Sequence, residues 1–533
     1  MNGPDSRGIP SAAPGRRDLG NVAQTVEQPT PATLARSDRL ISDAVDPARR
    51  ESIASIFSTP AVEIPAIVSR ARKAAGSWEV LPAERRAFAL AELRRLIARQ
   101  TGAIAETIAR SMGKPMVEAF WYDVAPVLQT LDAFIARPRV VGVVAPPVVC
   151  VIAPISLPFE RALAPAVAAL AAGSAVVVKP ASSASLVGAL IASLFEDAFA
   201  DFPGLAQVVQ GGAQIGSLLA TAEDVDRVVF SGARGSALRL QAALEPLRRS
   251  AWIEPLSVVP LIVCEDANLE RAANASVYGR FCNNGQGGDS VNRILVHRAV
   301  AAEFVHKVVH KVRALKVGPY TDAHCELGPL ASARAQPHLL AILQDAIDNR
   351  AAVLTGGAPP RVVETAYASR RGFYWPPTVL SDVAPSTRVM REETFGPILA
   401  IASFHDESEA IALANGPSHG SGACVFSGAR ERAAGIAGAL RARRVAVNDV
   451  LLMAGARGGC WQSEGAGPGG EASPAADQQP VPAQQVRMGN GEIDREPTWF
   501  PYSLAKLRSA EGAIARLAAQ DRPATADLVT ADG

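Results

Sequence analysis

Two hydrophobic periods divide the chain into a helical first part and a longer part that alternates strands with helices. From Ser42 to Ala136, apolar residues recur every three or four positions between charges, which is the period of amphipathic helices. From Val140 onward, short β-branched runs such as AVVVKP and VDRVVFSG alternate with Ala- and Leu-rich stretches of helical length. The pattern predicts helices followed by α/β structure built on parallel, doubly wound sheets.

The alternation occurs in two successive units. The first ends near the strand VDRVVFSG, and the second begins with WIEPLSVVPLIVCED and continues through GPILAIASF. In parallel sheets ligands bind beyond the carboxyl ends of the strands, and here those ends carry Lys179-Pro180, Gly211-Gly212 and Phe230-Ser231-Gly232. No G-x-G-x-x-G motif follows any of these strand ends, so an ordinary dinucleotide fingerprint is absent there.

Composition narrows the class of protein. The 533 residues are 48% hydrophobic and 20% charged, as in soluble globular proteins, and the net charge of +1 favours neither nucleic acid nor an acidic membrane surface. The longest apolar run, 140–158, is broken by Pro146, Pro147 and Pro154 and predicts buried strands instead of a membrane span. Six scattered cysteines and the lack of a secretory h-region predict a reduced, cytoplasmic protein without a metal site.

A glycine-rich turn lies in the stretch YGRFCNNGQGGDSVNRILVH, 278–297. We expect a helix end, a turn over 284–288, and a strand over 293–297. Glycines between a helix and a strand let the backbone approach another group closely, although a tight surface turn would have the same composition. This turn is the first candidate for a functional site.

The residues around the turn resemble a known active-site signature. Phe281-x-Asn283-x-Gly285-Gln286, followed by Arg293 and Val296, is similar to the pattern F-x-N-x-G-Q-x-C-x-x-x-x-R-x-x-V of the aldehyde dehydrogenase superfamily. The motifs APxxxP, VVVKPAS, FSG, EETFGP and VND follow the order of that family between residues 64 and 450. The chain looks most like the branch that oxidises fatty, aromatic and coniferyl-type aldehydes.

The resemblance implies an α/β, aldehyde dehydrogenase-like fold with two doubly wound domains and an N-terminal helical segment. The expected divisions are a disordered tail over 1–40, a nucleotide-binding domain with its helices over 41–252 and 427–455, a catalytic-type domain over 253–426, and an irregular extension with a short helix over 456–533.

The reacting end departs from the family pattern. In this family a cysteine thiolate attacks the aldehyde, hydride leaves to the nicotinamide, and a glutamate activates the water that releases the acid. Gly288 is at the position of that cysteine, and Ser156 replaces the oxyanion asparagine. Glu254 matches the general base, but Pro255-Leu256-Ser257-Val258 follows it where the family has small residues, which narrows the space for nicotinamide.

The cofactor end is better retained, and the resemblance implies NAD or NADP. Lys179 matches the lysine that contacts the adenine ribose, and Glu393 and Phe395 match residues that contact the nicotinamide ribose and ring. Ser182 replaces an NAD-favouring glutamate, which removes repulsion against a 2′-phosphate. Gly232 and Arg234 belong to the turn that faces the phosphates, where Arg234 offers positive charge.

Three functional hypotheses follow. In the first, the family oxidation is lost or poor because glycine cannot form the covalent intermediate, and the protein is a nucleotide-binding or scaffold protein. In the second, the enzyme is active and its nucleophile is supplied by Cys282 or by a rearranged loop; Asp289 and Ser290 are adjacent, but neither has an evident base partner. In the third, Glu254 serves a non-covalent hydride transfer. Under each of them we expect a homodimer or tetramer, with an aldehyde as the substrate if the protein is active.

Overall fold

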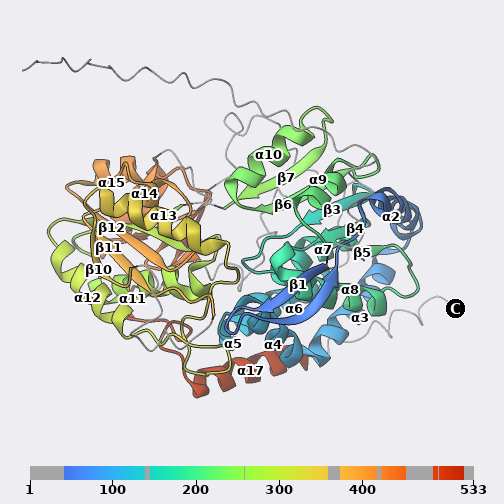
Figure 1. The fold of residues 1–533 in the computed structure, drawn as a ribbon, viewed down its shortest axis with the longest axis horizontal. Coiled ribbons are helices and arrows are strands. Elements are labelled where there is room, and N and C mark those ends of the chain that lie inside the picture. Colours follow the sequence, from blue (N-terminus) through green and yellow to red (C-terminus); the bar gives the residue numbers. More distant parts are fainter. Residues whose placement is uncertain are drawn as a thin grey trace, which may run out of the picture. The chain divides into compact units, whose positions relative to one another are not determined.

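The computed structural model describes residues 41–137, 145–256, 258–357, 372–416, 422–451, 484–489 and 491–520. All of these residues belong to one unit of contacts, Arg39–Gly533. A five-stranded sheet and an eight-stranded sheet organise this unit (Figure 1). The tail expected over 1–40 and the strand expected over 140–144 lie outside the described residues.

The five-stranded sheet is entirely parallel and has the order β5-β4-β3-β6-β7. Its strands are β3 (Val148–Ile152), β4 (Ala175–Lys179), β5 (Ala206–Val208), β6 (Arg227–Gly232) and β7 (Ser250–Pro255). The connecting helices are α7 (Glu160–Ala172), η3 (Ser182–Ala184), α8 (Ser185–Ala198), α9 (Ala213–Thr221) and α10 (Arg234–Leu244). Every side chain of β4 is buried, because helices cover both faces of a doubly wound sheet. The first predicted sheet is therefore confirmed, except that the run WIEP, expected to begin the second unit, forms the edge strand β7 of this sheet and pairs with β6.

The eight-stranded sheet has the order β10-β11-β12-β9-β8-β13-β14-β15, and only the β10–β11 pair is antiparallel. Its strands are β8 (Val259–Val263), β9 (Val291–His297), β10 (Ala352–Thr355), β11 (Thr378–Ser381), β12 (Ile398–Phe404), β13 (Gly422–Phe426), β14 (Arg444–Val447) and β15 (Gln485–Met488). Its helices are α11 (Leu269–Phe281), η4 (Cys282–Gly285), α12 (Ala301–Arg313), α13 (Ala335–Asp348), α14 (Arg388–Arg391), α15 (Glu407–Ala414) and α16 (Arg430–Ala439).

Helices cover both faces of this sheet as well. Figure 1 shows α11 and α12 on one side and α13 and α14 on the other. On the α13 side, Leu339 and Ile342 belong to the same buried cluster as Leu295 and Ala400 of the central strands. A sheet buried on both faces needs continuous apolar strands, which explains the runs VPLIV and ILAIASF.

The N-terminal part is helical, as predicted, except at its start. The prediction of helix from Ser42 was wrong for the first residues, where β1 (Ile41–Asp46) and β2 (Glu51–Phe57) form an antiparallel hairpin. Both runs carry β-branched residues, and Arg50 has a left-handed φ of 61° in the turn between them. The helices that follow are η1 (Ala61–Glu63), α2 (Ile64–Glu79), α3 (Ala83–Arg99), α4 (Thr101–Met112), α5 (Met116–Glu118), η2 (Ala119–Val124) and α6 (Ala125–Ala136).

The predicted division of the C-terminal part needs a correction. Segment 427–455 was assigned to the nucleotide-binding domain, but its strand β14 pairs in parallel with β13 and β15 in the eight-stranded sheet. The segment after 484 was expected to be an irregular extension with a short helix. It adds β15 to the sheet edge and ends in α17 (Leu504–Ala518), a helix of 15 residues. β15 reads QVRM, a run of only four residues after a glycine- and proline-rich stretch, and its pairing with β14 is a long-range contact that the local composition does not indicate.

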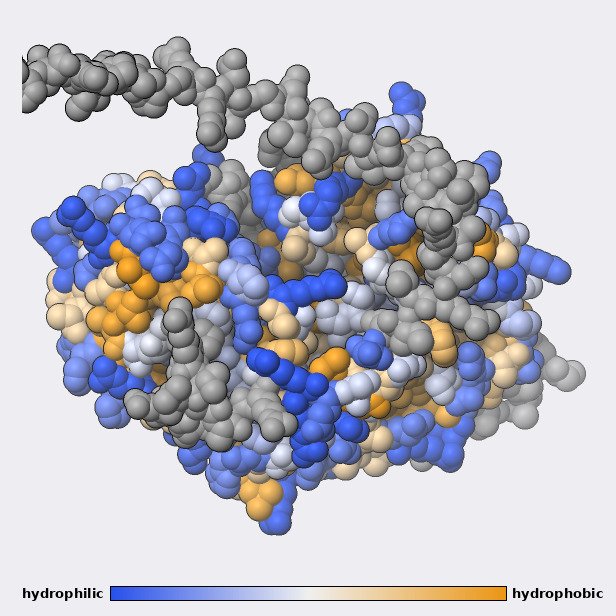
Figure 2. Space-filling model, viewed as in Figure 1, coloured by the Kyte–Doolittle hydropathy of each residue, from blue (hydrophilic) through white to orange (hydrophobic). Residues whose placement is uncertain are grey.

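The surface is mainly hydrophilic in the view of Figure 2, with an apolar area over β10–β12 and α13. Leu340 and Ile347 of α13 and Val353 of β10 are exposed large apolar residues of these elements. Among the described helices, none is both long and apolar enough to cross a membrane.

Candidate active site

The glycine-rich turn is buried and anchored on several sides. Asn283 and Asn284 have φ values of 55° and 57°, the left-handed region that asparagine tolerates better than most residues. Asn283 Nδ2 donates to the Ser156 carbonyl at 2.8 Å, and Asn284 Oδ1 accepts from the Gly328 N–H at 2.6 Å. A Cβ on Gly285 would lie 2.6 Å from the carbonyl carbon of Gly396. The alternative of a tight surface turn is therefore wrong.

Gly288 lies at the amino end of β9, facing the carboxyl end of β7. A Cβ built on Gly288 would lie 2.4 Å from Leu256 Cδ2, which is closer than real Cβ contacts. Leu256 itself comes one residue after β7 and two after Glu254. The structure thus brings together the predicted nucleophile position and the run that follows the predicted base.

Glu254 is paired with two arginines. Its Oε2 lies 3.1 Å from Arg161 Nη1, and its Oε1 lies 3.6 Å from Arg444 Nη2. Arg444 also forms a two-pronged contact with Asp289, at 2.7 and 3.1 Å, while Arg161 Nη2 lies 3.7 Å from the same carboxylate. We call these four side chains the arginine bridge. It joins α7, β7, the turn before β9 and β14.

Glu160 extends this cluster of charges. Its Oε2 lies 3.2 Å from Arg161 Nε, and its side chain is only 6% exposed. Burial raises the pKa of Glu160 to about 7, although Arg161 opposes that rise. The site is therefore crowded with acidic groups that depend on Arg161 and Arg444 for neutralisation.

Ser156 is buried next to the turn, but its recorded contacts are made by its backbone. The Ser156 carbonyl accepts hydrogen bonds from Asn283 Nδ2 at 2.8 Å and from Lys114 Nζ at 3.3 Å. Lys114 in turn pairs with Asp123 at 2.8 Å, and both side chains are at most 1% exposed. The predicted oxyanion position thus lies against Asn283 of the glycine-rich turn, and its carbonyl also accepts from the lysine of a buried ion pair.

Cys282 points into the protein core, away from solvent. It is completely buried, and burial together with the negative charge of Glu118 raises the pKa of its thiol well above the ordinary value. Glu118 accepts hydrogen bonds from the Asn283 N–H at 2.8 Å and from the Tyr502 hydroxyl at 2.9 Å. A thiol in these surroundings stays protonated, and the thiolate is the nucleophilic form.

Lys179 lies at the carboxyl end of β4 as predicted, and it is 5% exposed. Burial lowers its pKa to about 8. Its Nζ donates to the Pro180 carbonyl at 3.0 Å, and no acidic side chain pairs with it among the described residues. Nearby, Ser185 Oγ and Gln210 Oε1 are buried without a hydrogen-bond partner in the described part of the chain. Unpaired buried donors and acceptors of this kind fit a polar ligand such as a ribose.

The other residues predicted near the adenosine half lie at a strand end of the same five-stranded sheet or at the start of the helices that follow its strands. Ser182 begins η3, directly after the Lys179-Pro180 strand end, and is half-buried. Gly232 ends β6, and its carbonyl accepts the Leu256 N–H at 2.9 Å. Arg234 is the first residue of α10 and is exposed. The positive charge of Arg234 is thus available at a helix N-terminus, where anions are favoured.

Glu393 and Phe395 lie in the segment that leads to Gly396, whose backbone packs against Gly285 of the glycine-rich turn. Burial raises the pKa of Glu393 to about 7, partly offset by the charge of Arg280, and its Oε1 lacks a partner among the described residues. Phe395 has a left-handed φ of 39°, and the next residue, Gly396, accepts a hydrogen bond from Arg280. No recorded hydrogen bond or ion pair of the described residues joins this pair to Lys179 or Ser182.

The sequence did not single out Arg161 or Arg444 as functional residues. A signal for Arg161 existed, because Glu160 and Arg161 are the only charged residues between Arg139 and Lys179. The sequence suggests Asp289 only as a substitute nucleophile, whereas in the structure its carboxylate forms an ion pair with Arg444. Partners from distant segments cannot be paired by spacing alone, which is why the arginine bridge was missed.

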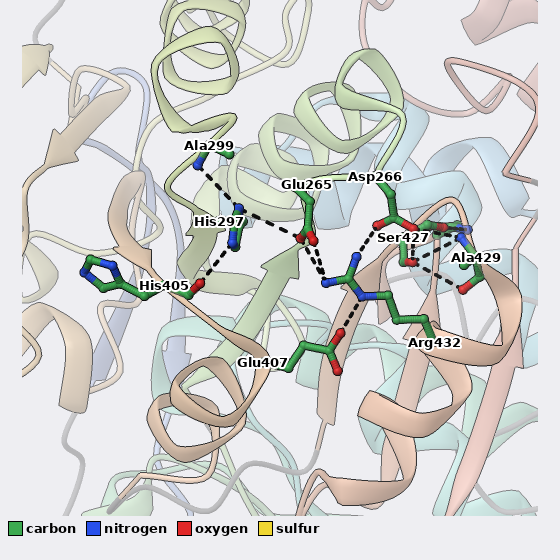
Figure 3. Close-up of polar contacts among 10 residues, drawn as sticks. Glu265, Asp266, His297, Ala299, His405, Glu407, Ser427, Ala429 and Arg432 are labelled. Carbon is green, nitrogen blue, oxygen red and sulfur yellow. Dashed lines mark hydrogen bonds and ion pairs between the residues drawn. The ribbon is translucent and has the colours of Figure 1, made fainter.

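A second charged cluster closes the carboxyl end of the eight-stranded sheet (Figure 3). Arg432 contacts Glu265, Asp266 and Glu407, at 2.9, 3.1 and 2.5 Å. Figure 3 also shows His297 beside Glu265 and Ser427 beside Asp266. The acidic groups share one arginine, and within the described ranges no group of three or more His, Cys, Asp or Glu side chains is placed to hold a metal ion.

The protein has two α/β sheets, and the candidate site lies where β7 of the five-stranded sheet ends and β9 of the eight-stranded sheet begins. This arrangement is typical of nucleotide-dependent dehydrogenases. A family model described as "Aldehyde dehydrogenase family" matches residues 35–475. The chain therefore belongs to the aldehyde dehydrogenase family.

Several characterised relatives and solved structures support this assignment. The chain is 34% identical to a 4,4′-diapolycopene aldehyde oxidase of a Methylomonas species, over 84% of this chain and 85% of that protein. It is 29% identical to a peroxisomal aminoaldehyde dehydrogenase of Pisum sativum, over 76% and 84%. An indole-3-acetaldehyde dehydrogenase in complex with NAD+ superposes with a TM-score of 0.71 at 26% identity, over 77% and 85%. An aldehyde dehydrogenase from Bartonella henselae superposes with a TM-score of 0.72 at 26% identity, over 76% of this chain and 87% of that chain.

Proposed function

We propose that this protein binds NAD or NADP and has lost, or retains only weakly, the aldehyde oxidation of its family. The observation that supports this proposal is the glycine at position 288, with Leu256 Cδ2 in the space of the missing side chain. Covalent catalysis requires the nucleophilic group itself, and hydrogen bonds or charge nearby do not replace it.

The surroundings of the alternative nucleophiles favour this proposal over an active enzyme. Cys282 is fully buried with a raised thiol pKa. The Asp289 carboxylate is engaged by Arg444, and Ser290 Oγ accepts the Gly287 N–H at 3.1 Å. The carboxylate next to the Cys282 thiol, Glu118, is fully buried and already accepts hydrogen bonds from the Asn283 N–H and the Tyr502 hydroxyl. Because burial keeps the Cys282 thiol protonated, Cys282 lacks the activation that a substitute nucleophile needs.

Non-covalent hydride transfer with Glu254 as base is the weaker alternative. A base must reach the proton that it removes, and both oxygens of Glu254 face arginine side chains. If a Glu254→Gln variant lowers any measured turnover, this alternative gains support. An unchanged rate would remove it.

For the nucleotide, Lys179 and the unpaired Ser185 and Gln210 atoms supply donors and acceptors for an adenine ribose. The nicotinamide would supply hydride acceptance. The Glu393 carboxylate would accept a hydrogen bond from the nicotinamide ribose. Ser182 adds no negative charge beside Lys179, so we propose that NADP binds at least as well as NAD.

The decisive test is a fluorescence titration of the purified protein with NADH and NADPH, followed by an aldehyde panel in the same cuvette. The panel contains fatty, aromatic and coniferyl-type aldehydes, an aminoaldehyde and a carotenoid aldehyde, the last two because of the names of the relatives. Binding without turnover is the expected result. Saturable NAD(P)H formation that depends on aldehyde would contradict the loss of activity.

We also propose that the protein is a cytoplasmic homodimer or homotetramer, as expected from the sequence. Light scattering coupled to size-exclusion chromatography would measure the subunit number directly. A monomer at micromolar concentration would contradict the proposed assembly.

A further inference from the structure

Leu256 and Gly288 fit together only because position 288 has no side chain. The Cβ of any other residue there would lie 2.4 Å from Leu256 Cδ2 and 3.8 Å from Leu256 Cγ. The first distance is far below van der Waals contact, so a side chain at 288 and the present position of Leu256 exclude each other. The thiol of the family signature would need the volume that Leu256 now fills.

One backbone hydrogen bond ties Leu256 to the neighbouring strand of the sheet. Its N–H donates to the Gly232 carbonyl at 2.9 Å. The preceding residue, Pro255, ends β7 in register with Gly232, and proline restricts the backbone further. The leucine side chain is therefore directed by a strand end that is held in the sheet.

The arginine bridge holds the two facing segments together. Glu254 lies two residues before Leu256, and Asp289 lies one residue after Gly288. Arg161 and Arg444 each contact both carboxylates, at distances between 2.7 and 3.7 Å. The four side chains are 12–20% exposed, so solvent screens these contacts less than it screens surface pairs.

We propose that the Leu256 side chain is a plug that occupies the candidate active centre, and that the arginine bridge keeps the segments of Leu256 and Gly288 together. The plug is a second obstacle to the family reaction, in addition to the missing cysteine. This inference rests on the proposed function, because it takes position 288 as the site of the nucleophile. It predicts that a Gly288→Cys change alone does not create an accessible thiol. Leu256 must also be shortened before a thiol at 288 reacts.

The test measures thiol reactivity, which does not depend on nucleotide binding or turnover. Native protein is treated with 5,5′-dithiobis(2-nitrobenzoate), and the modified residue is identified by peptide mass spectrometry. The proteins are wild type, Gly288→Cys, Leu256→Ala and Gly288→Cys/Leu256→Ala. Gly435→Cys is the matched control, because Gly435 is exposed on α16 and a Cβ there meets nothing within 4 Å.

We expect the thiol at 288 to react many times more slowly than the control thiol at 435, and Leu256→Ala to accelerate it several-fold. Arg444→Leu added to Gly288→Cys should also accelerate it, because one side of the bridge is released. Chemical unfolding of the same set is the second measurement. Gly288→Cys should lower the midpoint, and Leu256→Ala in the double variant should recover part of that loss.

Two results together would overturn the proposal that Leu256 is a plug. The thiol of Gly288→Cys would react at the same rate with and without Leu256→Ala, and the two substitutions would have additive effects on the unfolding midpoint. Such a result would leave the proposed loss of activity intact, since that loss is tested by the aldehyde panel with wild-type protein. Turnover by wild-type protein would instead contradict the proposed function while the thiol measurements remain valid.

Discussion

At the scale of single residues, the site is decided by what surrounds each titratable group. Cys282 and Gly288 are six positions apart in one turn, yet Cys282 is buried beneath Glu118 while Gly288 faces Leu256. A cysteine in this stretch is thus no evidence of catalysis. The spacing in the sequence could not distinguish a packed thiol from a reactive one.

We predict that Cys282→Ser leaves any residual aldehyde-dependent NAD(P)H formation unchanged. The hydroxyl replaces a buried thiol, so the free energy of unfolding should fall by about 1–3 kcal/mol without a change in rate per folded molecule. Steady-state assays and denaturant unfolding of the same preparations check both parts. A rate that collapses while the fold persists would make Cys282 the nucleophile after all.

Glu118 should make stability depend on pH. Burial raises its pKa from 4.5 to about 7, with Lys114 opposing, so the folded state binds this proton more tightly than the unfolded chain does. The free energy of unfolding therefore falls as pH rises through that window, by on the order of 1–3 kcal/mol for this group.

The Glu118→Gln variant should lose that part of the pH dependence. Unfolding in urea between pH 5 and pH 8, as about six closely spaced points, measures the slope. Glu431→Gln, at an exposed position of α16, is the control and should keep the wild-type slope. Parallel profiles for wild type and Glu118→Gln would show that another group titrates.

At the scale of elements, strand ends and helix starts place charges where a ligand could use them. β4 buries Lys179 at its carboxyl end, and the lysine side chain runs beneath Gly216 of α9, whose Cβ would lie 3.2 Å from Lys179 Cδ. The apolar run AVVVK predicted the strand, and its last residue carries the charge. Burial and charge at one position are the signal that favours a binding role.

We predict that NADPH binding weakens as pH rises through about 8, because the lowered pKa of Lys179 means that its ammonium is lost there. Lys179→Met should bind NADPH roughly tenfold more weakly at pH 7 and lack that pH step, since a charged hydrogen bond is missing. Fluorescence titrations across pH measure both effects. Lys73→Met, on the exposed face of α2, should behave as wild type.

The arginine bridge links elements that the sequence separates widely. We predict that Arg444→Ala lowers the free energy of unfolding by about 2 kcal/mol, because Asp289 keeps only the 3.7 Å contact with Arg161. Adding Asp289→Ala should recover part of the loss. Arg430→Ala, at an exposed position of α16, should change stability little. Strictly additive effects in this cycle would contradict the bridge.

At the scale of the whole molecule, the C-terminal segment returns to the core of the chain. Trp499 is completely buried, with Arg271 Cζ 4.9 Å from the centre of its ring and Tyr278 stacked at 5.9 Å. Tyr502 donates its hydroxyl to Glu118 at 2.9 Å. The part expected to be an extension is therefore integrated with α5 and α11.

We predict that Trp499→Ala lowers the free energy of unfolding by about 3–5 kcal/mol, because it empties a buried site and removes a ring that Arg271 covers. Leu504→Ala, at a position that is 44% exposed, should cost far less and serves as the control. Denaturant unfolding measures both. Equal small losses would show that this segment is not part of the folded core.

The sequence by itself determined most strands and helices of both sheets and the family. It also showed that glycine is at the position of the family's cysteine, residue 288. Apolar periodicity is a local property, and a motif such as F-x-N-x-G-Q is read directly from neighbouring residues. The tertiary structure alone decided the hairpin β1–β2, the pairing of β14 and the burial of Cys282. It also decided that Leu256 meets Gly288 and that Arg161 and Arg444 share the carboxylates of Glu254 and Asp289. These depend on which distant segments meet, and a contact between distant segments is fixed by the packing of the whole chain and not by any local pattern.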